Sequence, residues 1–274
     1  MARAARARAQ AALPSQAGAP SDDQRCVKNL VLPLVGLLLA ALGGRVLWRA
    51  RRHASVPELG VGVWFAGIGI GTPIMHRASI PGGVAPELAP VLIGLGQGLI
   101  ALAFCGLFVF AWRTFGPDSG WRRILAGAGV CACLATWAGV GWFEGFAPGA
   151  GLATLVLAGV RTVAVAWAFV ETTRYAIRMR RRARIGLADP VVANRFALWS
   201  VWTGSLLLGM GVAIGVRWTQ IELGSGRVVD VDALVSMTRV VFALFGLVAS
   251  SAMWLSFFPP ARYQAWLRAE SAGA

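Results

Sequence analysis

The chain has 274 residues, of which 57% are hydrophobic and only 14% are charged. An ordinary soluble domain is about 45–50% apolar and about 25% charged. This composition, with a mean hydropathy of +0.65, excludes a soluble globular protein and indicates that much of the chain lies in lipid.

Uncharged or nearly uncharged apolar segments follow one another along the chain. Each has roughly 17 to 26 residues, which suits a hydrocarbon core about 30 Å thick at about 1.5 Å per helical residue. Transmembrane β-barrels have shorter strands of alternating polarity instead. We therefore predict an all-α integral membrane bundle of seven transmembrane helices, at 30–46, 59–75, 88–112, 124–143, 146–170, 196–216 and 233–258.

The arginines predict the orientation, because short loops rich in Lys and Arg remain in the cytoplasm. The first, third and fifth loops and the C-terminal tail hold most of the arginines, with the densest group in the loop 174–195. The other three loops hold only Arg77, Arg217 and Arg227. We expect the N-terminus outside and the C-terminus inside.

A basic tail at 1–28 opposes this orientation, because its positive charge resists export. Three interpretations remain open: a tolerated exported tail that is disordered, a start codon placed too early in a high-GC gene, and a targeting segment. The richness in alanine, arginine and glycine favours a bacterium with a high-GC genome. The bacterial inner membrane is therefore the expected location. The net charge of +14 follows from the topology and the tail, so we expect contact with lipid headgroups and no nucleic acid.

The transmembrane domain is expected to span 29–258 and to end at Pro259 and Pro260, which cannot continue a helix. Beyond them, Tyr263, Trp266 and Leu267 are spaced as on one helix face. This pattern predicts a short interfacial helix within 259–274, either as an anchor or as a docking element.

Small residues four apart predict close helix packing, as at Gly67 with Gly71 and at Gly211 with Gly215. Tryptophans near the predicted helix ends are typical of the aromatic belt at the membrane surface. These are Trp48, Trp112, Trp121, Trp142, Trp199 and Trp218.

The residue inventory argues against several membrane chemistries. The only histidines are His53 and His76, so no histidine pair can hold a haem inside the bilayer. The sole lysine is Lys28, which excludes a retinal Schiff base in the last span. We expect no metal, no cofactor and no enzymatic activity, and we interpret the cysteines as ordinary apolar-site residues: Cys26, Cys105, Cys131 and Cys133.

Polar side chains inside the spans are the candidate site, because an ionisable group at the bilayer centre costs at least about 2.5–3.5 kcal/mol. Arg161 lies roughly 15 Å into its span, Gln97 reaches a similar depth, and Arg239 lies about 9 Å into the last span. Glu144 stands at the outer helix end, within reach of either arginine. We predict a ligand site of Arg161, Arg239, Gln97 and Glu144 for a small anion or carboxylate. The alternative is an Arg161 held by internal hydrogen bonds. Glu171 is interpreted as the partner of Arg174, three residues on.

Two stretches of the chain are distinctive: Gly-Leu-Ala-Asp-Pro-Val-Val-Ala-Asn-Arg-Phe at 186–196 with Leu198-Trp199, and Trp254-Leu255 with Phe257-Phe258-Pro259-Pro260 and Tyr263. They resemble segments of uncharacterised bacterial seven-helix integral membrane proteins. The resemblance implies a receptor-like topology and no established activity. Within the first stretch, Asp189-Pro190 predicts a helix start.

These features favour a non-enzymatic sensor or receptor-like protein with an outward-facing anion pocket. Its cytoplasmic face, made by the loop 174–195 and the terminal helix, would pass a signal to a protein partner. Two alternatives remain: a small-anion transporter or permease subunit, and an assembly or scaffold protein without a ligand.

Overall fold

The computed structural model describes residues 22–53, 55–80, 82–147, 151–223 and 231–272, and all of its regular elements are helices. The side chains of 22–32, 53, 217, 220–223, 231–240, 242, 243 and 270–272 lie outside this description. The helices are α2 (Asp22–His53), α3 (Val56–Ser79), α4 (Ala89–Phe115), α5 (Gly120–Glu144), α6 (Leu152–Arg184), α7 (Pro190–Leu223), α8 (Val231–Phe257) and α9 (Ala261–Ala272).

The chain divides into two compact units, 1–35 and 36–274. The boundary falls inside α2, and the second unit contains the helical bundle. Of the basic tail predicted at 1–28, residues 1–21 lie outside the described part, whereas 22–28 already belong to α2. The remaining description concerns the second unit.

Six helices in the described part of the chain are long and apolar enough to cross a membrane. They correspond to the first six predicted spans. The seventh predicted span falls in α8, whose described stretch Leu244–Phe257 reaches the same standard only together with Ala261–Ala269, across a bend of 82°. The all-helical membrane bundle is thus confirmed, while the count of seven and the orientation stay predictions.

Local signals explain where several helices begin and end. Asp189 caps α7, because its carboxylate accepts a hydrogen bond from the Val191 amide at 2.8 Å, and Pro190 is the first helical residue, as predicted. The predicted start of the fifth span at Phe146 is wrong. Gly145 closes α5 with a φ of 60° and Phe146 follows with a φ of 55°, so the chain turns there and α6 begins only at Leu152.

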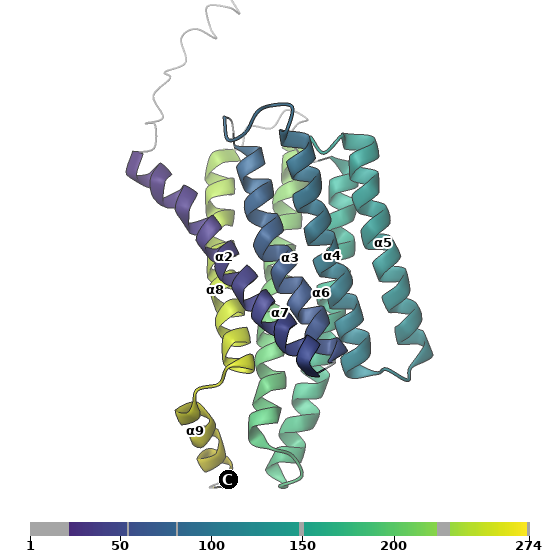
Figure 1. Cartoon of the computed structure of the whole chain (residues 1–274), viewed down its shortest axis with the longest axis vertical. Helices are drawn as coiled ribbons and strands as arrows, with labels where there is room; N and C mark the ends of the chain where they lie inside the picture. The colour runs from purple at the N-terminus through teal and green to yellow at the C-terminus, as the bar shows by residue number, and fades with distance from the viewer. Residues whose placement is uncertain (1–21, 54, 81, 148–150, 224–230, 273–274) are drawn as a thin grey trace, which may run out of the picture. The chain divides into compact units, whose positions relative to one another are not determined.

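Consecutive helices of the bundle run antiparallel (Figure 1). In α2 and α3, Gly43 lies against Ala66 while Gly62 lies against Leu47. In α3 and α4, Gly60 lies against Gly106 and Gly71 against Gly96. The partners' numbers fall in one helix as they rise in the other, so each connection between these helices reverses the direction of the chain.

Glycine lets α3 approach α4 closely. A Cβ on Gly67 would lie 2.5 Å from the Leu99 carbonyl oxygen, and one on Gly71 would lie 2.6 Å from that of Gly96. Close packing at this pair is therefore confirmed. At Gly211 and Gly215 it is not found, because a Cβ there would meet no described atom within 4 Å.

Aromatic rings fill the core between α3, α4 and α7. Trp202 is fully buried, with its ring 5.0 Å from that of Trp64 and 5.9 Å from that of Phe65. Trp199 is only 8% exposed and packs 5.2 Å from Phe110. Its predicted place in the interfacial belt is wrong, because α7 begins earlier than the apolar run and carries this ring into the protein interior.

Candidate functional site

Arg161 and Gln97 lie side by side, as their similar depth predicts. Arg161 is partly buried on α6, about 14 Å along the helix from Leu152 at about 1.5 Å per residue. Its Nη2 donates to the backbone carbonyl of Gln97 on α4 at 3.3 Å. The guanidinium carbon also lies 5.7 Å from the centre of the Phe104 ring. The arginine therefore bridges two helices through a carbonyl and an aromatic face.

Gln97 brings a second polar group to this place. Its side-chain oxygen is buried and has no hydrogen-bond partner. A buried acceptor without a donor costs free energy comparable to the loss of a hydrogen bond. The Arg161–Gln97 pair therefore has capacity to accept a hydrogen bond as well as to neutralise negative charge.

Glu144, the predicted acid of the site, is engaged at a helix end. Its carboxylate accepts hydrogen bonds from the backbone amide of Thr154, at 3.1 Å, and from the Thr154 hydroxyl. These bonds satisfy one of the free amides at the start of α6 and place negative charge at the positive end of the helix dipole. This geometry gives Glu144 a structural task in joining α5 to α6. Arg239 belongs to α8, but its side chain lies outside the described residues.

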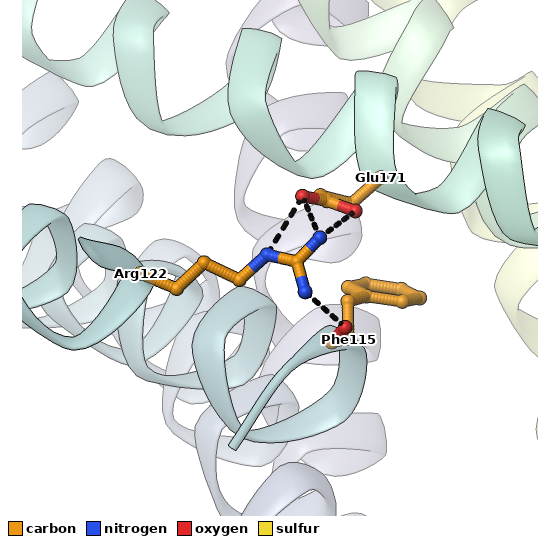
Figure 2. Close-up of polar contacts among 3 residues, drawn as sticks. All are labelled: Phe115, Arg122 and Glu171. Atoms are coloured by element: carbon orange, nitrogen blue, oxygen red, sulfur yellow. Dashed lines mark hydrogen bonds and ion pairs between the residues drawn. The ribbon is translucent and has the colours of Figure 1, made fainter. Parts of the chain in front are cut away.

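An ion pair between Arg122 and Glu171 joins three helices (Figure 2). It lies level with the arginine-rich C-terminal half of α6. Arg122, in the first turn of α5, binds both carboxylate oxygens of Glu171 on α6, with hydrogen bonds of 3.1 and 3.2 Å and a shortest ion-pair distance of 2.9 Å. Its Nη1 donates to the carbonyl of Phe115, the last residue of α4, at 2.7 Å. The Glu171 side chain is only 3% exposed. The ionic partner of Glu171 is thus Arg122, and its interpretation as a partner of Arg174 is wrong.

Position along the antiparallel hairpin explains this pairing. Arg122 lies near the start of α5 and Glu171 lies well along α6, so the α5–α6 turn brings them to the same level. A carboxylate prefers the bidentate fork of an arginine opposite it to an exposed arginine on its own helix. The sequence signal that finds this pair is distance from the turn, rather than spacing within one helix.

The same end of the bundle links α7 to α9. The Asn194 side-chain amide donates to the Tyr263 hydroxyl at 2.8 Å, and the Tyr263 ring stacks 5.8 Å from Trp266. Trp266 is 56% exposed. The predicted C-terminal helix is therefore attached to the bundle by its tyrosine and presents its tryptophan outward.

Two of the cysteines lie together. Cys105 on α4 and Cys133 on α5 are buried free thiols within interaction range of each other, with the Cys105 Sγ 3.9 Å from the Val130 carbonyl oxygen. The interpretation of both as ordinary apolar-site residues fits their burial, but spacing along one helix does not reveal that they lie close together. No group of three or more His, Cys, Asp or Glu side chains able to hold a metal ion occurs in the described part of the chain.

Six long apolar helices, close glycine packing and charged groups paired between helices define a multi-pass membrane protein. Comparison of the chain with family models, curated proteins and solved structures finds no match. The resemblance to uncharacterised bacterial seven-helix proteins stays a prediction.

Proposed function

We propose that the protein is a non-enzymatic, receptor-like sensor of the bacterial inner membrane that binds a small carboxylate at Arg161 and Gln97. The observation that carries this proposal is a guanidinium at membrane depth that binds the backbone carbonyl of Gln97, a residue whose buried side-chain oxygen has no hydrogen-bond partner. An arginine at this depth is costly, so its presence favours a task there. Arg161 neutralises the carboxylate, and the Gln97 oxygen accepts from a donor on the same ligand, such as a neighbouring hydroxyl.

Helix α6 supplies the connection to the other end of the bundle. It carries Arg161, then Glu171 about 15 Å further on, and ends in an arginine-rich turn at Arg184. A displacement of α6 by a ligand at Arg161 would act on the Arg122–Glu171 ion pair. The arginine-rich end and α9 would then present an altered face to a cytoplasmic protein partner.

The test is ligand-dependent thermal stabilisation of the purified protein across small anions and carboxylates, with and without a neighbouring hydroxyl. A ligand that binds only the folded state adds about 2.7 kcal/mol at a hundredfold excess over Kd. We expect this gain in the wild type and in Arg174→Gln, which removes an exposed arginine from the same helix. We expect its loss in Arg161→Gln.

Gln97→Leu separates binding from folding. Replacing a buried acceptor that has no partner leaves stability unchanged or raises it. A variant that folds as well as the wild type and loses the ligand response supports a binding role for Gln97. An unchanged response in both Gln97→Leu and Arg161→Gln contradicts the proposed site.

One observation favours a second candidate, a scaffold without a ligand. The hydrogen bond from Arg161 to the Gln97 carbonyl already joins α4 to α6. In a scaffold, Arg161→Gln lowers stability and no compound stabilises the wild type. A small-anion transporter shares the ligand response of the sensor and differs by anion flux in proteoliposomes.

A further inference from the structure

The antiparallel contact between α4 and α5 brings Cys105 opposite Cys133. The Trp137 indole donates to the Gly94 carbonyl at 3.0 Å near one end of this contact. Toward the other end, Phe108 lies against Gly129. Cys105 lies between these points, and its Sγ lies 3.9 Å from the Val130 carbonyl oxygen, one turn from Cys133. The register of the two helices therefore places the two thiols at one level.

The two thiols are enclosed and lie within interaction range of each other. Cys133 is 0% exposed and Cys105 is 9% exposed, and each side chain acts electrostatically on the other. A disulfide needs sulfurs about 2.05 Å apart and Cβ atoms about 3.5–4.5 Å apart. Thiols at one level on facing helices approach that geometry by rotation of their side chains.

A positive charge lies near the pair. Arg161 is within electrostatic range of the Cys133 sulfur. The thiolate is the reactive form of cysteine, and a nearby guanidinium attracts its negative charge. Arg161 therefore places a positive charge near the two thiols, in a membrane interior where charged groups are rare.

The depth of the two thiols in the bundle limits which oxidants reach them. Cys105 lies about 15 Å from Phe115 and about 24 Å from Ala89 along α4. A large or charged disulfide such as oxidised glutathione does not reach two enclosed thiols at that depth. A small uncharged oxidant does, and hydrogen peroxide is the smallest two-electron oxidant that attacks thiolates.

We propose that Cys105 and Cys133 form a peroxide-sensitive dithiol whose oxidation links α4 to α5 by a disulfide. One thiol gives up its proton and its thiolate attacks a peroxide oxygen. The O–O bond breaks and the leaving hydroxide takes up that proton, so a sulfenic acid and water form. The second thiol attacks the sulfenic sulfur, so the S–S bond forms and a second water leaves. Two thiols and one hydrogen peroxide thus give one disulfide and two waters. This inference stands independently of the proposed carboxylate ligand.

The test uses the full chain in native membrane vesicles treated with hydrogen peroxide, followed by alkylation of the remaining thiols and peptide mass spectrometry. Cys131, two residues from Cys133 and exposed on α5, is the matched control. We expect a 105–133 disulfide in the wild type and in Cys131→Ser. In Cys105→Ser we expect no disulfide and a sulfenic acid at Cys133, which dimedone traps when the protein is unfolded in its presence. Oxidised glutathione gives no linkage, and Arg161→Gln slows formation at least tenfold.

Mapping the disulfide in Cys131→Ser needs neither Cys105 nor Cys133 to be replaced, so a folding defect of those variants does not affect the result. Peroxide that leaves both thiols free, while the unfolded protein reacts, overturns the proposal. So does a disulfide that involves Cys131 in the wild type, or equal oxidation by oxidised glutathione. An unchanged rate in Arg161→Gln removes Arg161 from the proposed site.

Discussion

Arg122 and Glu171 show how the bundle accommodates charge at single residues. Glu171 is enclosed, and both of its carboxylate oxygens bind one guanidinium, which is held in turn by the Phe115 carbonyl. Arg49 and Glu58 form the contrasting pair, 3.7 Å apart, with side chains 46% and 23% exposed. Removing one ion of the enclosed pair leaves the other as a buried charge without a counter-charge, whereas solvent screens the exposed pair.

We predict that Glu171→Gln lowers the free energy of unfolding by about 3–5 kcal/mol, because it leaves the guanidinium of Arg122 without its counter-charge. Arg49→Gln is the control and changes it by at most about 1 kcal/mol. Reversible unfolding of the purified protein in mixed detergent micelles measures both. A double variant Arg122→Gln with Glu171→Gln that costs less than the two single changes together confirms the coupling.

Glu144 stabilises the start of a helix. We predict that Glu144→Ala destabilises the protein by about 1 kcal/mol, because an amide at the start of α6 loses its acceptor. The same measurement on Asp118→Ala, an exposed acid in the α4–α5 turn, provides the comparison. A Glu144→Ala variant as stable as the wild type contradicts the capping role.

At the scale of the helix, α3 owes its packing to residues without side chains. Gly60, Gly67 and Gly71 meet the α4 backbone, while Gly62 and Gly69 meet α2. Two glycine faces on one helix bring three helix axes close together. A glycine whose added Cβ would meet no described atom, such as Gly211, shows no such close approach.

We predict that Gly67→Ala destabilises the protein and Gly211→Ala does not. The added methyl at Gly67 meets the Leu99 carbonyl oxygen at 2.5 Å, whereas at Gly211 it points into open space among the described atoms. Overpacking costs about 1–3 kcal/mol, and alanine in an unobstructed helix gains a little stability over glycine. The midpoint of thermal unfolding checks the pair. Equal midpoints would show that α3 can withdraw from α4 without cost.

A side-chain hydrogen bond from Asn194 to Tyr263 attaches the short helix α9 to α7. We predict that Tyr263→Phe, which removes the hydroxyl that Asn194 donates to, increases proteolytic release of the C-terminal segment in membrane vesicles. Trp266→Phe is the matched control, since its ring is half exposed. Identical cleavage rates in both variants would show that other contacts hold α9.

On the scale of the whole molecule, the antiparallel order of consecutive helices brings most arginines of the second unit to one end of the bundle. The ends of α2, α4 and α6 and the starts of α5 and α7 meet at one end of the second unit, and these segments carry most of its arginines. The positive-inside rule then predicts that this end faces the cytoplasm.

We predict that a cysteine at exposed Asp118 reacts with a membrane-impermeant maleimide only from the cytoplasmic side. A cysteine at exposed Ser79, at the opposite end of the neighbouring hairpin, reacts only from the outside. Labelling of intact spheroplasts and inside-out vesicles, in a chain without its native cysteines, measures both. The reverse pattern would invert the orientation.

The sequence by itself determined that the chain is a helical membrane bundle and where most helices lie, because length and hydropathy are properties of each segment. Counting along each helix also predicted the similar level of Arg161 and Gln97, and the Asp189-Pro190 signal predicted the start of α7. The tertiary structure was needed to show that Glu171 pairs with Arg122, that Glu144 caps α6, that Trp199 is a core residue and that Cys105 faces α5 near Cys133. Each of these depends on which face of one helix meets which face of another, and that rotation is set by packing between segments rather than by the order of residues within one.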